Sequence, residues 1–125
     1  HVTDKTISGT PGYKCPIYER TGRFTEASEI YSFGMVMLEV LTGLSPSRSD
    51  PSAPGGISFP VEEAIATRQP GAMERCTWAV DRLAKWPEPV SQEVASLSLR
   101  GAHPSNECQR PTFADLVRAL RALTE

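Results

Sequence analysis

The chain has 125 residues, of which 39% are hydrophobic and 22% are charged, and its formal net charge is −2. This length and composition fit one compact domain or part of a larger one, and they exclude a mainly disordered chain. Near-neutral charge without a Lys/Arg cluster disfavours nucleic acid and anionic membrane surfaces as partners. The longest apolar run, residues 35–41, is interrupted by Glu39 and is too short to span a bilayer, so we expect no membrane segment in this chain.

The cysteines indicate the setting in which the chain works. Cys15, Cys76 and Cys108 are widely separated and odd in number, which disfavours a disulfide framework and a zinc site. We therefore expect no metal, and ordinary thiols in a reducing, intracellular setting. The first residue is His1 rather than Met and no signal segment follows it, so we expect the chain to be part of a longer product.

The first elements in chain order are a loop and a short helix. Residues 1–12 are rich in Thr, Ser, Gly and Pro and show no apolar periodicity, which predicts an exposed loop. A short helical turn is predicted over residues 16–21, ended by Gly22. Thr25 is then a suitable N-cap, and Glu26 places a negative charge in the first turn of the next helix.

That next helix has apolar residues on nearly every face and is predicted to end at Gly43. The apolar residues are Ile30, Tyr31, Phe33, Met35, Val36, Met37, Leu38, Val40 and Leu41. A helix that is apolar all round is expected to be buried in a core. Gly34 in its interior costs about 1 kcal/mol relative to Ala, so we expect a neighbouring element to pack closely there.

The second half of the chain predicts further helices and no convincing strand. Residues 45–60 are rich in Pro, Ser and Gly and are predicted to be an irregular insertion. Amphipathic pieces follow over residues 61–67 and 72–83, then an extended connector over 85–89 and a helix over 90–100 that is stopped by Gly101. Trp78 and Trp86 are interpreted as core anchors and His103 as a loop histidine.

The last helix is predicted to begin at a capping box, Thr112 to Asp115, with an apolar stripe that runs to the end of the chain. The fold class is therefore mainly α, with a long N-terminal loop. That loop cannot cover the central helix completely. We expect some apolar surface to face a segment that lies outside these 125 residues.

Three strings carry a resemblance to a known family. Gly9-Thr-Pro-Gly-Tyr13, followed by Pro16, resembles the end of a protein kinase activation segment, which runs into an Ala-Pro-Glu motif. Ser28-Glu-Ile-Tyr-Ser-Phe-Gly34 resembles the start of the central helix of the kinase C-lobe, and Cys108-Gln-Arg-Pro-Thr-Phe113 resembles the start of its final helix. Their order and spacing resemble the C-lobe of a eukaryotic-type protein kinase catalytic domain, from activation segment to last helix. Gly-Thr-Pro-Gly-Tyr and Tyr-Ser-Phe-Gly favour receptor-like and Pelle-type serine/threonine kinases.

The resemblance implies a division of the chain and an activity for the longer product. Residues 1–22 would be the activation segment and P+1 loop, and residues 23–125 the helical C-lobe with its Pro/Ser-rich insertion at 45–60. The full-length kinase would use ATP and Mg²⁺ to phosphorylate hydroxyl groups of a protein substrate. The Gly-rich loop, strand Lys, His-Arg-Asp loop and Asp-Phe-Gly site do not occur here. We expect no catalytic residue in this chain, no ATP or Mg²⁺ bound by it alone, and the missing N-lobe and catalytic loop as its partners.

The resemblance also assigns roles to the first loop. Thr10 matches the position that hydrogen-bonds the catalytic Asp and its neighbouring Lys. Thr10, Pro11, Gly12 and Tyr13 would form the P+1 wall that contacts the substrate residue after the phosphoacceptor. The alternative is a simple Pro-Gly turn, which the same residues would also make.

Hydroxyl residues earlier in this loop are candidate phosphorylation sites by the same resemblance. Thr3, Thr6 and Ser8 lie where kinases often carry activation-loop phosphates, and such a phosphate would pair with an Arg of the missing catalytic loop. Ordinary solvated loop hydroxyls are the alternative.

Two positions depart from the family pattern around the structural motif of Pro16, Glu29 and Arg110. The Glu of Ala-Pro-Glu is replaced by Ile17, although in the family that Glu pairs with the Arg that matches Arg110. A buried charge left without its partner costs several kcal/mol, so Glu19 would have to substitute or Arg110 would be solvated, as a surface Arg, or paired elsewhere. Glu29 replaces an Asp that accepts hydrogen bonds from the catalytic loop; its alternative role is a favourable charge at a helix N-terminus.

Three functions remain open at this point. The longer product is a protein kinase that phosphorylates Ser or Thr, a pseudokinase that docks proteins without chemistry, or a small helical interaction domain with coincidental motifs. Phosphorylation that depends on MgATP would distinguish the first from the others. A stable, soluble monomer of this chain alone would favour the third, because half of a kinase should expose its core.

Overall fold

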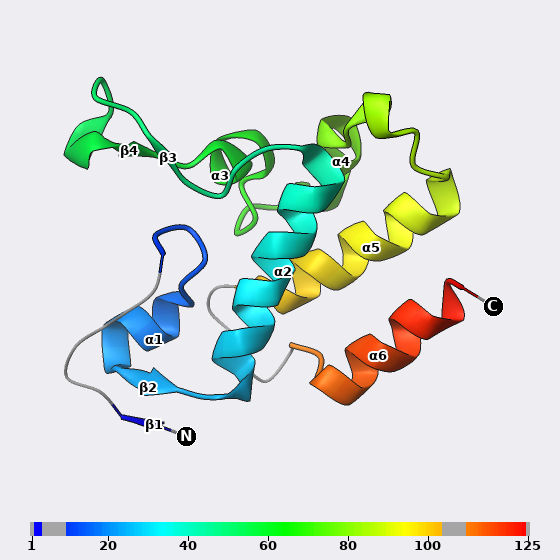
Figure 1. The fold of residues 1–125 in the computed structure, drawn as a ribbon, viewed down its shortest axis with the longest axis horizontal. Coiled ribbons are helices and arrows are strands. Elements are labelled where there is room, and N and C mark those ends of the chain that lie inside the picture. Colours follow the sequence, from blue (N-terminus) through cyan, green and yellow to red (C-terminus); the bar gives the residue numbers. More distant parts are fainter. Residues whose placement is uncertain (1, 4–9, 104–109, 125) are drawn as a thin grey trace.

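A computed structural model describes residues 2–3, 10–103 and 110–124, with side chains from residue 10 onward (Figure 1). The elements in order are β1 (Val2–Thr3), α1 (Pro16–Thr21), β2 (Arg23–Phe24), α2 (Glu26–Thr42), β3 (Arg48–Ser49), η1 (Pro54–Gly56), β4 (Ile57–Ser58), α3 (Pro60–Ile65), α4 (Ala72–Ala79), η2 (Arg82–Ala84), α5 (Glu88–Gly101) and α6 (Phe113–Ala122). The mainly α fold class is confirmed. None of the helices in the described ranges combines the length and apolar character needed to cross a membrane.

Helix α2 is the centre of the molecule, and α5 crosses it (Figure 1). The crossing is close because both helices carry glycine at the contact. A Cβ atom on Gly34 would lie 2.9 Å from the Ser98 carbonyl oxygen and 2.9 Å from the Ala102 nitrogen. A Cβ on Gly101 would lie 3.2 Å from the Ile30 carbonyl oxygen. The close packing predicted from Gly34 is therefore confirmed, and backbone atoms leave no room for a side chain.

The main core lies where α2, α3, α4 and α5 meet. Leu38 and Leu41 of α2 are fully buried there with Ile65 of α3 and Cys76 of α4. Burying each such Leu or Ile side chain contributes roughly 1.5–3 kcal/mol. A smaller cluster joins α2, α5 and α6; its buried members are Ile30, Met37, Leu97 and Leu116.

The connection between α3 and α4 is held by one arginine. The Arg75 guanidinium donates to four backbone carbonyl groups, those of Ile65 (2.6 Å), Ala66 (3.2 Å), Gln69 (3.0 Å) and Pro70 (2.8 Å). The first of these carbonyls ends α3 and the others lie in the connection to α4, so the side chain supplies donors that helical hydrogen bonds do not.

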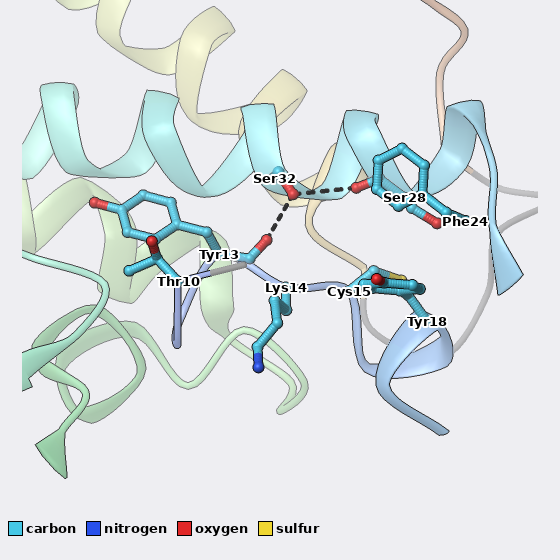
Figure 2. Close-up of a pocket in the computed structure, with 8 residues that line it drawn as sticks. All are labelled: Thr10, Tyr13, Lys14, Cys15, Tyr18, Phe24, Ser28 and Ser32. Carbon is cyan, nitrogen blue, oxygen red and sulfur yellow. Dashed lines mark hydrogen bonds between the residues drawn. The ribbon is translucent and has the colours of Figure 1, made fainter. Parts of the chain in front are cut away.

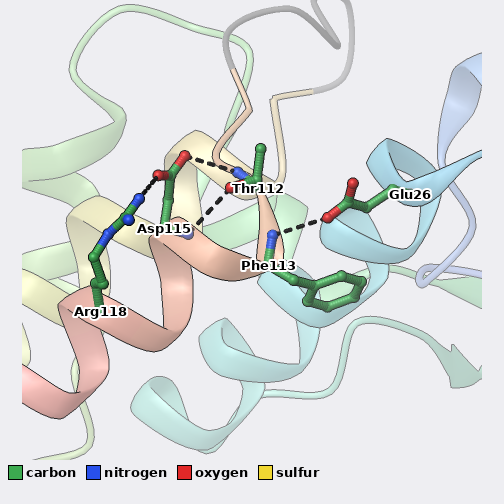
Figure 3. Close-up of polar contacts among 5 residues, drawn as sticks. All are labelled: Glu26, Thr112, Phe113, Asp115 and Arg118. Carbon is green, nitrogen blue, oxygen red and sulfur yellow. Dashed lines mark hydrogen bonds and ion pairs between the residues drawn. The ribbon is translucent and has the colours of Figure 1, made fainter.

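Helix α6 begins as the sequence predicts (Figure 3). The Asp115 backbone N–H donates to Thr112 Oγ1 at 3.1 Å, and the Thr112 N–H donates to the Asp115 carboxylate at 3.1 Å. The hydrogen bonds from Thr112 and the contact with Arg118 hold the pKa of Asp115 below its ordinary value. The Phe113 N–H donates to Glu26 at 3.0 Å and so attaches α6 to the first turn of α2.

Several predicted boundaries differ from the structure. The insertion at 45–60 is not wholly irregular, because β3 and β4 pair antiparallel with Arg48 opposite Ser58. Strands of two residues are too short to produce a visible alternation. The helix predicted over 72–83 ends at Ala79 and is followed by the separate turn η2. Helix α5 begins at Glu88 rather than Val90, since proline is tolerated in a first helical turn.

The prediction that α2 is buried all round is wrong for the described chain. Phe33, Val36 and Val40 are 37%, 39% and 59% exposed, and Phe113 and Val117 of α6 beside them are also exposed. These five residues are called the open face below; most of them line a groove of about 490 Å³ between α2 and α6. An apolar surface of this kind agrees with the expectation that a further segment covers α2.

The two tryptophans differ in their burial. Trp86 is half-buried and packs against the main core, as predicted. Trp78 is 78% exposed and lies under the Arg82 guanidinium, so its interpretation as a core anchor is wrong. Helix α4 presents only one side to the core, through Cys76, and Trp78 lies on the other side.

Candidate functional site

The segment of residues 10–13 is a tight turn that lies against the start of the insertion. The Tyr13 N–H donates to the Thr10 carbonyl at 3.2 Å, and Gly12 has φ +89°. A Cβ atom on Gly12 would lie 2.7 Å from the Pro46 carbonyl oxygen. The conformation and the contact both require glycine here. The Pro-Gly turn expected from the sequence is therefore present.

Tyr13 fastens this turn to α2 at two points, and Figure 2 shows the contact with Ser32. Its phenol donates to the Glu39 carboxylate at 2.5 Å, and its backbone carbonyl accepts from Ser32 Oγ at 2.6 Å. The hydrogen bond to Glu39, partial burial and the Glu39 charge raise the pKa of Tyr13 to about 12. The phenol is thus a proton donor at neutral pH, and α2 determines the position of the turn.

A cavity of about 550 Å³ opens beside the turn (Figure 2). Its lining is Thr10, Tyr13, Lys14, Cys15, Tyr18, Phe24, Ser28 and Ser32. Thr10 is exposed, and its hydroxyl has no hydrogen bond to a described residue. This lining offers hydroxyls, one ammonium and one thiol, but it holds neither carboxylate nor imidazole. The lining therefore offers hydrogen-bonding groups, while general base chemistry would need groups from elsewhere.

Arg110 lies at the centre of a buried polar cluster, with only 7% of its surface exposed. Its guanidinium donates to the His103 carbonyl at 2.7 and 3.0 Å, to the Ala27 carbonyl at 2.7 Å and to Cys15 Sγ at 3.2 Å. The guanidinium carbon also lies 5.2 Å from the centre of the Tyr31 ring. Carbonyl dipoles and an aromatic face together replace water around the cation.

The expectations for Arg110 are settled by this arrangement. It is not a solvated surface residue, because it is buried and hydrogen-bonded. Among the residues described, no carboxylate lies within 4.0 Å of it, so Glu19 does not substitute for the missing partner. Ile17, at the position of that partner, is half-buried and packs against the main core. An apolar side chain thus occupies the position at which the resemblance requires a charge.

Comparison with known proteins finds similarity to plant protein kinases. A receptor-like protein kinase of Arabidopsis thaliana is 31% identical over 124 residues, which cover 92% of this chain and 12% of that protein. An LRR receptor-like serine/threonine-protein kinase of the same plant is 32% identical over 97% of this chain and 13% of its own length. A PTI1-like tyrosine-protein kinase, also from Arabidopsis thaliana, is 34% identical over 94% of this chain and 31% of its own length.

The chain is a fragment of a protein kinase domain of this receptor-like type. It spans between 12% and 31% of the length of these three relatives. No family model matches it.

The remaining predicted positions of the kinase fragment are placed as follows. Pro16 is the first residue of α1. Glu29 is exposed in the first turn of α2 and lines the groove of the open face. The backbone of Thr3 pairs with Arg23, while the Thr3 side chain and all of Thr6 and Ser8 lie outside the described residues.

The sequence analysis missed two residues that hold this site. Glu39 was seen only as the charge that interrupts an apolar run, yet it accepts the Tyr13 phenol. A carboxylate among buried helix residues needs a donor, so its position was the available signal. Cys15 had no signal, because its contact with Arg110 joins residues 95 positions apart.

Proposed function

We propose that the longer product containing this chain is a protein kinase that transfers the γ-phosphate of ATP, with Mg²⁺, to serine or threonine hydroxyls of protein substrates. These 125 residues would supply its substrate-side half. The supporting observation is the turn at residues 10–13, which Tyr13 fastens to Glu39 and Ser32 of α2 beside an open cavity. A turn that is fastened to the central helix beside an open cavity suits a surface that positions a peptide.

In this proposal residues 1–22 are the activation segment and P+1 loop, and residues 23–125 are the helical C-lobe. The exposed Thr10 hydroxyl bonds the catalytic Asp, while Pro11, Gly12 and Tyr13 contact the substrate. Phosphorylation of Thr3, Thr6 or Ser8 orders the loop. Upstream residues supply the ATP site and cover the open face, and Glu29 accepts hydrogen bonds from their catalytic loop.

The dependence on ATP places this activity inside the cell, in the cytoplasm or on the cytoplasmic side of a membrane protein. The substrate-side half alone binds neither ATP nor Mg²⁺, because the resemblance assigns those ligands to upstream residues.

A pseudokinase is the second candidate, and two positions favour it. Ile17 replaces the Glu that would pair with Arg110, and Glu29 replaces the shorter Asp. In that case the fragment would dock a protein through the same turn without phosphoryl transfer.

The test is an assay of the longest natural product that contains the chain, with radiolabelled ATP and Mg²⁺. We expect phosphate on serine or threonine of a protein substrate, and a loss of about tenfold or more in Thr10→Ala, since Thr10 would hold the catalytic Asp in place. Thr77→Ala is the matched control, because the Thr77 hydroxyl bonds only the Met73 carbonyl within α4. A folded product that binds ATP and transfers no phosphate would establish the pseudokinase instead.

A further inference from the structure

A second cavity, of about 270 Å³, lies between the turn at residues 10–13, α2 and α3. It is distinct from the cavity of Figure 2, although Lys14 lines both. Its apolar walls include Met35 of α2, which is buried, and Phe59, which is 40% exposed. Its volume lies just below the roughly 300–1,000 Å³ of pockets for drug-sized ligands, so it suits one side chain rather than a whole cofactor.

Tyr31 lines this cavity with a hydroxyl that the fold does not use. The residue is 7% exposed, and its ring is held under the Arg110 guanidinium. No described residue hydrogen-bonds with the hydroxyl, which is not among the fully buried polar atoms and is therefore open to the cavity. Burial raises the pKa of Tyr31 to about 12, so the group remains a donor at neutral pH. A donor in this position favours an acceptor that enters the cavity.

The charged groups that line the cavity differ in whether they already have a hydrogen-bond or ion-pair partner. Lys14 and Arg68 line it, and neither donates a hydrogen bond nor forms an ion pair with a described residue. The Glu62 carboxylate already accepts from the Thr67 backbone N–H, at 3.3 Å, and from the Thr67 hydroxyl. Glu19, on α1, is the other carboxylate of the lining. The lining thus carries two cations and two carboxylates, and its donors without a partner among the described residues are Lys14, Arg68 and the Tyr31 phenol.

We propose that this cavity binds an acidic side chain of a partner protein, with Tyr31, Lys14 and Arg68 as donors and an adjoining apolar residue of the partner against Phe59. Carboxylate and phosphate oxygens share the chemistry that these donors recognise. The site goes beyond the proposed kinase activity, because such binding requires neither ATP nor a catalytic loop. It is a docking site for a protein substrate or regulator beside the residues that would contact the substrate residue after the phosphoacceptor.

The test uses fluorescent pools of degenerate nonapeptides whose central residue is fixed as Glu, Gln, Lys or phosphoserine. Binding of each pool to the longest natural product that contains the chain is measured by fluorescence anisotropy at physiological salt, without ATP. We expect the Glu pool to bind at least about threefold more tightly than the Gln pool, and the Lys pool to bind most weakly. If the phosphoserine pool exceeds the Glu pool, phosphate is the natural ligand, and the reverse order assigns a carboxylate.

Variants distinguish specific binding in this cavity from non-specific electrostatic attraction. Arg68→Ala and Tyr31→Phe should each weaken binding of the Glu pool by about threefold, and Tyr31→Phe keeps the ring that Arg110 needs. Arg82→Ala is the matched control, because Arg82 is exposed and lies outside this lining. Thermal melting establishes that each variant is folded.

Equal binding of the Glu and Gln pools would overturn the proposal, as would an Arg82→Ala loss equal to that of Arg68→Ala. Because ATP is absent, a product that fails to transfer phosphate can still pass this test, so the two proposals can fail separately.

Discussion

The two sides of α2 differ in how completely this chain covers them. On one side Tyr13 and Arg110 connect segments far apart in sequence to the helix, through Glu39, Ala27 and the Tyr31 ring. On the other side, the open face leaves aromatic and aliphatic side chains in contact with solvent. Burial of that apolar area would be favourable. This chain therefore covers the side of α2 that faces the turn at residues 10–13 and leaves the open face uncovered.

The largest effect on the free energy of unfolding is expected at Gly34, where α2 and α5 cross. Gly34→Ala places a methyl group 2.9 Å from backbone atoms of α5, which cannot move aside as a side chain would. Overpacking of this kind costs roughly 3 kcal/mol, and the better helix propensity of Ala offsets about 1 kcal/mol of it. Urea unfolding should show a net loss of about 2 kcal/mol. A variant as stable as the natural chain would contradict the close crossing of α2 and α5.

The next largest effect on the free energy of unfolding is expected at Arg110, in the buried polar cluster. Arg110→Met removes all four hydrogen bonds and leaves the Ala27 and His103 carbonyls without these donors, at a cost of roughly 2–4 kcal/mol. Arg118→Met is the matched control. Its side chain is 74% exposed and pairs only with Asp115, so the expected loss in urea unfolding is below about 1 kcal/mol. Equal losses in the two variants would show that the buried cluster contributes no more to the free energy of unfolding than the exposed ion pair does.

Tyr13 gives a smaller effect with a distinct dependence on pH. Tyr13→Phe removes the bond to Glu39 and should cost roughly 1 kcal/mol at neutral pH. The folded pKa of Tyr13, about 12, is raised above the ordinary tyrosine value of 10.0. The stabilisation is therefore fully present below pH 10.0 and lost as the pH rises toward about 12.

Denaturation curves across that range test the assignment. The difference in stability between the natural chain and Tyr13→Phe should shrink between pH 10.0 and about 12. Tyr31, whose pKa is also raised to about 12, is unchanged in both proteins and so cancels in the comparison. A difference that stays constant with pH would contradict the bond between Tyr13 and Glu39.

The fold was predictable where its causes are local. Apolar periodicity located α2, Gly34 indicated a close neighbour, and Thr112 with Asp115 marked the start of α6. The hairpin of β3 and β4 was missed because its strands are too short to alternate. Trp78 was misplaced because a large aromatic is usually buried, while a helix that packs on one side only must expose the other.

The residues of the candidate site were predictable from sequence motifs, but the contacts that bring them together were not. The strings at residues 9–13 and 28–34 indicated a protein kinase because they resemble kinase motifs, but they did not predict which residues meet. Their fastening depends on contacts across 26 residues from Tyr13 to Glu39, and across 83 residues from Arg110 to Ala27. Such pairings leave no local pattern. The replacement of a charge by Ile17 predicted that Arg110 needs new partners, yet it could not show that carbonyl groups and a thiol would serve.

The smallest effect on stability, and the most direct test, comes from the open face. Val36→Cys places a thiol in the groove, and Thr77→Cys places one at an exposed site on α4. Maleimide labelling, read by peptide mass, would be compared in this chain and in the longest natural product that contains it, with the buried native Cys76 as an internal check of folding.

If upstream residues complete the kinase domain, Val36→Cys is labelled in the chain and protected in the longer product, while Thr77→Cys is labelled in both. Equal labelling of Val36→Cys in the two proteins, with Cys76 unlabelled throughout, would contradict the proposal that the rest of the domain packs on the open face of α2.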